Sequence, residues 1–352
     1  MEGVSGVPQN LFLQNVIAVV WDFDKTLIPG YMQDPLFAHY GIDATAFWRE
    51  VDEVRSQMQK RGEKEGVRTS DDIVLLNHIL KYVREGKFEG LNNGMLRELG
   101  KKIQFYPGLP EFFPALRSRI EKNATFRKHE IHVEHYIVST GLRQMILGSG
   151  IAEHVTEVWG CEFVEGPVVQ QEMTILAAPV VPNRRGRYRG GATDAPTVLT
   201  QIGYVIDDTT KTRAIFEINK GSNVTVGIDA NAAMRYEDRR VPFQNMIYIA
   251  DGPSDVPVFS IINQYRGKTF AVYDPGSRDH FAQVRGLQDQ DRVQSFGEAN
   301  YQEGSQTYMW LVDSAEKIAQ RIADDRRRAL EDRVVPPPHH ITNGGPPVAG
   351  VQ

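Results

Sequence analysis

The chain has 352 residues, of which 41% are hydrophobic and 24% are charged. This composition is typical of a globular protein, with a chain long enough for about two domains, and it excludes a wholly disordered or collagen-like chain. Because 45 aspartates and glutamates outnumber 40 lysines and arginines, giving a net charge of −5, we do not expect a general nucleic-acid-binding protein.

The N-terminal region and the cysteine content indicate a cytoplasmic protein. No lysine or arginine precedes Lys25, and the apolar stretch 16–21 is too short to span a bilayer. The single cysteine, Cys161, excludes an internal disulfide and a cysteine-built zinc site, and the apolar residues before it indicate that it is buried. We therefore expect a soluble cytoplasmic protein with no membrane partner.

Four short apolar runs predict the strands of a buried sheet, at 15–21, 135–138, 245–250 and 268–273. Continuous apolar runs of this length are typical of parallel strands that are covered on both faces. Amphipathic patterns predict helices at 71–84, 108–120, 209–220 and 314–333. The alternation of strands and helices in the core predicts a doubly wound α/β sheet, a fold whose ligands bind beyond the carboxyl ends of the strands.

Three segments lie outside this alternating pattern. Residues 29–106 contain no convincing strand and are predicted to form a helical cap inserted over the active edge of the sheet. Residues 163–203 combine strand-forming stretches with a loop rich in proline, glycine and arginine, and they predict a small β insertion. The rest of the chain divides into a predicted catalytic core, 1–28 and 107–332, and a predicted disordered tail, 333–352.

Two aspartates come directly after the first predicted strand. In an extended backbone residues two apart face the same side, so Asp22 and Asp24 could both point into a crevice at the carboxyl end of that strand. Close carboxylates repel one another, and a cation or a proton is needed to keep them together. A small number of carboxylate oxygens suits Mg²⁺, which keeps several waters and binds phosphate oxygens. The alternative is a turn with two solvated aspartates.

Two other predicted strands also end in polar residues. Ser139, Thr140 and Gly141 follow the second strand and supply hydroxyl groups and flexible backbone amides. Asp251 and Asp255 follow the run that ends at residue 250 and precede another helix. Each group taken alone also fits a structural role, such as capping the helix that follows. Their coincidence at the ends of three buried strands favours one shared site for a metal ion and a phosphate group.

Together these residues resemble the motifs of the haloacid dehalogenase superfamily of phosphohydrolases. The four motifs of that family occur in order: Asp22-x-Asp24-x-Thr26, Ser139 closing an apolar strand, a helix-borne lysine, and Asp251-Gly252-x-x-Asp255. The resemblance covers about residues 15–275, and the inserted cap resembles that of the phosphoserine phosphatase-like branch. It implies phosphoryl transfer, because the dehalogenase branch lacks the second carboxylate of the first motif.

The resemblance also implies a role for each site residue. Asp22 would be the nucleophile that forms an aspartyl-phosphate, and Asp24 the general acid and base. Mg²⁺ would be held by Asp22, the backbone carbonyl of Asp24 and Asp251, with Asp255 orienting the metal ligands. The remaining residues would hold the phosphoryl group or the nucleophile loop, and they are Ser139, Lys211, Thr26, Thr140 and Gly141.

The lysine of the family pattern has two candidates on one predicted helix. Lys211 opens the helix, so its charge could reach a phosphate at the catalytic edge, whereas Lys220 lies at the far end, where a cation favours the helix dipole. We favour Lys211. Its long separation from Asp251 implies an extra loop over 231–244, and Lys25, inside the first motif, is expected to be solvated.

The residues that would select a substrate are less clearly marked. Phosphoserine phosphatases of the family carry a glutamate shortly after the first motif, but residues 30–34 contain none, which disfavours phosphoserine. Candidate contacts are Tyr31, Gln33, Asp34 and Arg68, each of which also fits a surface or cap-packing role. The run 184–189 holds four arginines and a tyrosine, and we favour a solvated loop over a site that grips a polyanion.

The sequence thus predicts a Mg²⁺-dependent phosphatase that hydrolyses a small phosphorylated metabolite through an aspartyl-phosphate, with no nucleic-acid partner. Two alternatives stay open. One is a phosphotransferase that uses an alcohol acceptor in place of water, and the other is a catalytically silent binding protein of the same fold. The sequence leaves the physiological substrate and the oligomeric state open.

Overall fold

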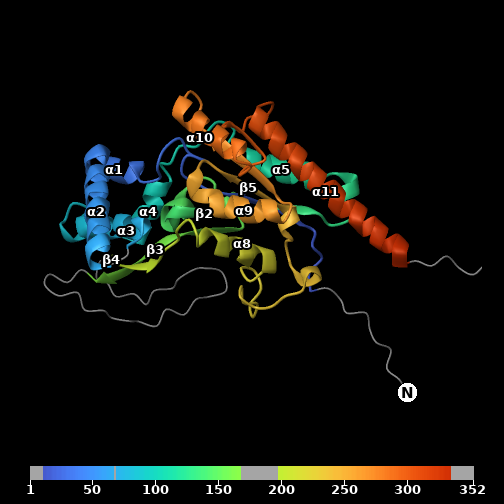
Figure 1. Ribbon diagram of the computed structural model, residues 1–352, viewed down its shortest axis with the longest axis horizontal. Helices are drawn as coiled ribbons and strands as arrows, with labels where there is room; N and C mark the ends of the chain where they lie inside the picture. The colour runs from blue at the N-terminus through green and yellow to red at the C-terminus, as the bar shows by residue number, and fades with distance from the viewer. Residues whose placement is uncertain (1–10, 67–68, 168–196, 334–352) are drawn as a thin grey trace, which may run out of the picture.

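The computed structural model describes residues 11–66, 69–167 and 197–333, and its centre is a sheet of seven strands (Figure 1). The order across the sheet is β4-β3-β2-β1-β5-β6-β7, and neighbouring strands are parallel except β3 and β4. The predicted doubly wound α/β sheet is therefore confirmed. The strands are β1 (Val16–Trp21), β2 (His132–Leu142), β3 (Glu157–Pro167), β4 (Thr197–Tyr204), β5 (Met246–Ala250), β6 (Lys268–Tyr273) and β7 (Ser295–Glu298).

Helices cover both faces of the sheet, because its central strands are apolar on both sides. All residues of β1 and β5 are buried. α5 (Phe112–Glu121) and α11 (Gln306–Arg333) pack together on one side, whereas α8 (Lys211–Lys220) and α9 (Val256–Gln264) pack together on the other (Figure 1). The other core helices are α6 (Ala124–Arg127), α7 (Arg143–Gly148) and α10 (Arg278–Asp289).

A helical unit follows β1 and lies beside the β3–β4 edge of the sheet (Figure 1). Aromatic rings form its interior, where Phe47 lies 4.6 Å from Phe37 and 5.2 Å from Tyr82 between ring centroids. The predicted helix over 71–84 is confirmed, and the Ser70 hydroxyl caps it by accepting a hydrogen bond from the Ile73 amide at 3.4 Å. The unit consists of α1 (Asp34–Tyr40), α2 (Ala44–Glu65), α3 (Asp71–Arg84) and α4 (Asn93–Gly100).

The helical unit docks on the core where α4 meets α7. A Cβ atom on Gly100 would lie 2.1 Å from the carbonyl oxygen of Met145, and one on Gly148 would lie 2.0 Å from that of Arg97. Because no side chain fits such distances, both positions need glycine for the helices to approach. α7 comes directly after β2, so this contact sets the position of the helical unit relative to the carboxyl end of β2.

The two ends of the predicted β insertion over 163–203 extend the main sheet, whereas its strand-forming stretches at 168–169 and 174–176 lie outside the described residues. β3 pairs with β2 in its first half and with β4 in its second. The extension also contacts the helical unit, because the Leu199 amide donates to the Leu91 carbonyl at 2.9 Å and the Asn93 amide to Glu165 at 2.7 Å. The arginine-rich run 184–189, Arg68 and the tail after residue 333 lie outside the described residues.

Several boundaries differ from those that the sequence predicts. β2 continues through polar residues to Leu142, whereas its apolar run ends at residue 138. The helix predicted from residue 108 begins at Phe112, because Gly108 has a φ of 89° and approaches the backbone of Tyr301 too closely for any Cβ. In the described parts of the chain no helix is both long and apolar enough to cross a membrane.

A buried histidine on β2 predicts a loss of stability in acid. His135 accepts a hydrogen bond from Trp21 Nε1 at 3.2 Å and contacts the Phe113 carbonyl at 3.3 Å, an arrangement that requires a neutral ring. Burial, assisted by the charge of Arg117, lowers the pKa of His135 to about 3. As the pH falls below about 6.5, the unfolded chain therefore binds a proton at this histidine that the folded chain does not bind. Because of this difference, the free energy of unfolding should fall by about 3 kcal/mol between pH 7 and pH 4.

Denaturant unfolding at the two pH values measures this effect. We expect a His135→Gln variant, which cannot titrate, to lose about 3 kcal/mol less than the wild type when the pH falls from 7 to 4. The exposed His39 supplies the control, because His39→Gln makes the same change of side chain at the surface of the protein. An equal pH dependence in His135→Gln and the wild type would contradict the assignment.

Candidate active site

The carboxyl ends of three neighbouring strands bring the predicted motif residues to one edge of the sheet. Trp21, the last residue of β1, pairs with Ile137 of β2 and with Ile249 of β5. The Asp22 amide continues this ladder by donating to the Ile249 carbonyl at 2.9 Å. Because the three strands are parallel and in register, Asp22 emerges between the ends of β2 and β5, which carry Ser139 and Asp251.

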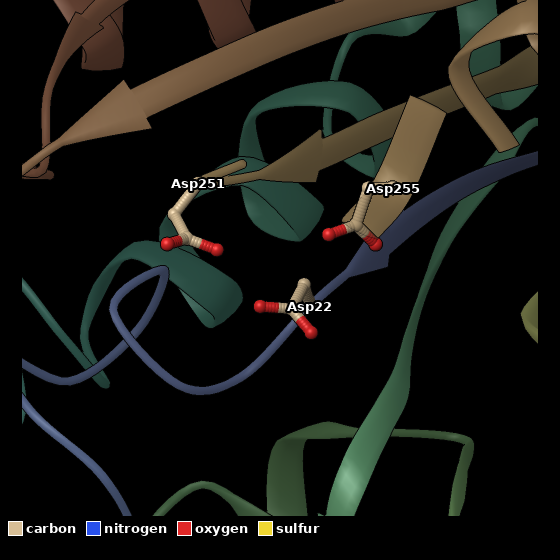
Figure 2. Close-up of side chains that lie close together, drawn as sticks. All are labelled: Asp22, Asp251 and Asp255. Carbon is tan, nitrogen blue, oxygen red and sulfur yellow. The ribbon is translucent and has the colours of Figure 1, made fainter. Parts of the chain in front are cut away.

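Three carboxylates meet at this edge, and Figure 2 shows them facing a common space. One oxygen from each of Asp22, Asp251 and Asp255 lies within 4.8 Å of the others. Burial raises the pKa of Asp22, although Lys211 opposes the rise, and burial followed by repulsion from Asp22 and Asp255 raises that of Asp251 to about 7. Carboxylates whose charge is disfavoured in this way provide the oxygen ligands that a divalent cation requires.

Lys211 makes direct contact with two of these carboxylates. Its Nζ atom lies 2.8 Å from Asp22 Oδ1 and 2.7 Å from Asp255 Oδ1, and its side chain is 2% exposed. Lys211 is the first residue of α8, and Asp207 fixes the start of that helix by accepting hydrogen bonds from the amides of the two threonines before it. Lys220 lies at the other end of α8, where its Nζ contacts the Ala230 and Ala232 carbonyls.

Thr26 and Asp24 hold the loop that follows β1. The Thr26 hydroxyl donates to Asp22 Oδ2 at 3.0 Å, and Asp24 Oδ1 accepts from the Met32 amide at 2.8 Å. Burial, followed by repulsion from Asp22, raises the pKa of Asp24 well above its usual value, so the site favours the protonated form of this carboxyl group. The two aspartates of the first motif therefore have different partners, Lys211 and Thr26 for Asp22 and a backbone amide for Asp24.

The end of β2 bulges away from β3, which alters the hydrogen bonding of the second motif. The pairing shifts by two residues between Val138 and Leu142. Within the bulge, Ser139 is buried and its Oγ accepts from the Gly141 amide at 3.0 Å. Thr140 is partly buried, and its carbonyl accepts from Cys161 Sγ at 3.2 Å. The bulge thus brings backbone amides and the Ser139 hydroxyl to the edge where Asp22 emerges.

Cys161 is buried as predicted, and it also links two parts of the site. Its Sγ atom contacts the Thr140 carbonyl of the second motif and accepts from the Ile206 amide at 3.3 Å, just before the segment that begins α8. Burial raises the pKa of the thiol to about 12, which keeps it protonated and able to donate. The sequence indicated the burial of Cys161 but not these contacts.

The predicted substrate contacts lie around the start of the helical unit. Tyr31 is 41% exposed, its hydroxyl accepts from Lys25 Nζ at 2.8 Å, and its ring lies 5.2 Å from that of Trp48. Tyr31 and Asp34 line a cavity of about 450 Å³, whereas Gln33 is buried. Lys25 is partly exposed and contacts Tyr31 rather than standing fully in solvent.

Met32 and Tyr248 belong to the site although the sequence did not single them out. Met32 is buried over the second motif, where its Sδ accepts from the Leu142 amide at 3.0 Å. The Tyr248 hydroxyl donates to Asp255 Oδ1 at 2.5 Å. Nothing in the local sequence marks Met32. Tyr248 carries a hydroxyl inside an apolar strand, and a buried hydroxyl must find a partner, so this residue could have been found.

A comparison with known protein sequences identifies a related protein. No family model matches the chain. An uncharacterized protein of Borreliella burgdorferi is 38% identical over 303 residues, and the match covers 85% of this chain and 96% of that protein.

Similar solved structures share far less sequence. A HAD family hydrolase from Salmonella enterica serovar Typhi is 11% identical, with a TM-score of 0.42 over 82% of this chain and 68% of that one. A phosphoserine phosphatase with an analogue of the phospho-aspartyl intermediate is 12% identical, with a TM-score of 0.39 over 80% and 93% of the two chains. An L-2-haloacid dehalogenase from Xanthobacter autotrophicus is 13% identical, with a TM-score of 0.33 over 78% and 83%.

The sequence match and the geometry of the site each relate this chain to known proteins. The match to the Borreliella burgdorferi protein extends over nearly all of that protein. The first, third and fourth motifs meet through direct contacts among Asp22, Lys211 and Asp255, and the second ends the neighbouring strand. The chain therefore belongs to the same family as the Borreliella burgdorferi protein, and the motifs that resemble those of the haloacid dehalogenase superfamily lie together at one edge of its sheet.

Proposed function

We propose that this protein is a Mg²⁺-dependent phosphatase that hydrolyses a small phosphorylated metabolite through an aspartyl-phosphate. The observation that carries the proposal is the contact of one buried ammonium, Lys211, with Asp22 and Asp255, beside the carboxylate of Asp251. A site for phosphoryl transfer must position the nucleophile and stabilise negative charge, and these four residues supply both functions at one edge of the sheet.

The donor set fits a magnesium ion. Asp22 and Asp251 present carboxylate oxygens to a common space, and the raised pKa of Asp251, about 7, reflects burial and repulsion that a cation would relieve. With the backbone carbonyl of Asp24, these two residues would hold the ion. Bound Mg²⁺ would neutralise charge on the phosphoryl oxygens and allow an anionic substrate to approach the aspartates.

The chain's own groups account for the two chemical steps. A carboxylate oxygen of Asp22 attacks phosphorus, the bond from phosphorus to the leaving oxygen breaks, and Asp24 gives its proton to that oxygen. Water then attacks the phosphorus of the aspartyl-phosphate, Asp24 takes a proton from it, and the Asp22 carboxylate is released with inorganic phosphate. The high pKa of Asp24 suits a group that must begin the reaction protonated.

Other groups hold the phosphoryl group while these steps occur. Lys211 compensates its negative charge and keeps Asp22 in place. The Ser139 hydroxyl and the backbone amide of Thr140 would donate to its oxygens from the end of β2, and the Gly141 amide would hold Ser139 in place by donating to its Oγ atom. Thr26 fixes the nucleophile by donating to its second oxygen.

A phosphate-release screen tests the proposed function. With Mg²⁺ present, we expect the purified protein to hydrolyse at least one ester in a panel of sugar, nucleotide, amino-acid and lipid-headgroup phosphates. An Asp24→Asn variant should be slower by about 10²-fold on the same ester, because it cannot transfer the proton. A wild-type protein that releases no phosphate from any ester of the panel would refute the proposal.

A further inference from the structure

Tyr248 is a polar residue in the middle of a strand that is otherwise apolar. It is completely buried in β5, and its ring packs edge-on against Phe259 with 5.5 Å between centroids. Its hydroxyl donates to Asp255 Oδ1 at 2.5 Å, and burial followed by the negative charge of Asp255 raises the pKa of Tyr248, so the phenol keeps its proton. The packed ring thus presents a donor in a fixed position.

The oxygen that accepts from Tyr248 is also the one that binds the lysine. Asp255 Oδ1 accepts from Tyr248 at 2.5 Å and from Lys211 at 2.7 Å, whereas Asp255 Oδ2 accepts from the Ser254 hydroxyl at 3.0 Å. The same Lys211 ammonium donates to Asp22 Oδ1 at 2.8 Å. A continuous chain of buried hydrogen bonds therefore runs from Tyr248 through Asp255 and Lys211 to Asp22.

Two donors on one oxygen share its negative charge. With Tyr248 in place, the attraction of Asp255 for the ammonium is reduced, and the position of Asp255 Oδ1 is fixed by a rigid partner. Without the hydroxyl, Lys211 would be the only donor to Oδ1 among these contacts. In a site that excludes water the stronger attraction would draw the ammonium toward Asp255 and away from Asp22.

We propose that Tyr248 is a positioning residue that keeps the Lys211 ammonium shared between Asp255 and Asp22. Its consequence for turnover rests on the proposed phosphatase function, because Lys211 would have to reach both the nucleophile and the phosphoryl group. Tyr248 itself acts only through Asp255 and Lys211.

A Tyr248→Phe variant removes the hydroxyl and keeps the ring. We expect kcat/KM for the ester found in the phosphate-release screen to fall about tenfold at a temperature where the variant is fully folded. The same substitution in an Asp255→Asn background should change kcat/KM by less than twofold, because the group through which Tyr248 acts is already altered. A purely structural role would not produce this dependence on Asp255.

Tyr136 provides a matched control for this substitution. It is a completely buried tyrosine on β2, and its hydroxyl donates to the Glu134 carboxylate, which is paired with Arg240. Tyr136→Phe therefore removes the same kind of hydrogen bond from another ion pair. It should lower Tm while leaving kcat/KM within twofold of the wild type.

A crystal structure of Tyr248→Phe separates this inference from the proposed function. We expect the distance from Lys211 Nζ to Asp22 Oδ1 to exceed 3.5 Å, the limit of a hydrogen bond. If the wild type hydrolyses no ester, the proposed function fails and this distance alone decides the role of Tyr248. A different outcome would overturn the inference: an active wild type, a Tyr248→Phe variant with the same kcat/KM, and Lys211 still in contact with both Asp22 and Asp255. The proposed phosphatase function would then still stand.

Discussion

An Asp22→Asn variant is expected to lose phosphatase activity by about 10³-fold or more while remaining folded. An amide oxygen is a poor nucleophile for phosphorus, so the covalent step is blocked. The amide has nearly the shape of the carboxylate, and its oxygen can still accept from Thr26 or Lys211, which now contact the two carboxylate oxygens of Asp22. Phosphate release and circular dichroism measure the two parts of this prediction.

Trapping the intermediate makes the assignment specific to Asp22. With an ester labelled at phosphorus, acid quenching during turnover should leave label on the wild-type protein and none on Asp22→Asn. Asp43→Asn is the control, because Asp43 caps α2 through its side chain and asparagine caps helices equally well. If Asp22→Asn kept near-normal activity, another residue would have to be the nucleophile.

The sheet could be predicted because its central strands are buried on both faces. A run such as 268–273 has no polar side to obscure it, and the observed strand has the same limits. β2 was predicted too short because its last residues are polar and are held as a strand by pairing with β3, a tertiary contact that the local sequence does not contain. α1 and β7 have seven and four residues, which is too short for a periodic pattern.

That the motif residues lie together could be predicted from the topology of the sheet more than from any single residue. In a parallel sheet, the strand ends that carry Asp22, Ser139 and Asp251 share one edge. The preference for Lys211 rested on its place at the start of a helix, and the structure places that lysine on Asp22. Tyr248 was missed because a tyrosine in an apolar run is usually read as core, and only the position of Asp255 reveals what its hydroxyl binds.

Magnesium is expected to control both the activity and the stability of this protein. Chelation with EDTA should abolish phosphate release, and added Mg²⁺ should restore it, because the phosphoryl group cannot otherwise approach Asp22, Asp251 and Asp255. An ion that binds only the folded state also stabilises it, by about 2.7 kcal/mol at 100 times its dissociation constant. Tm should therefore rise with Mg²⁺ concentration, and a thermal melt measures this without any substrate.

The thermal melt also tests where the ion binds. Asp251→Asn removes one of the carboxylate charges that face the common space, so this variant should show a much smaller rise of Tm with Mg²⁺ and an activity lower by about 10²-fold or more. Potassium chloride at equal ionic strength is the control, since it screens carboxylate repulsion without filling a site. If potassium chloride stabilised the wild type as much as Mg²⁺ does, the carboxylates would be only a repelling cluster. A rise of Tm that is specific to Mg²⁺ and depends on Asp251 requires instead that the ends of β1 and β5 hold one ion between them.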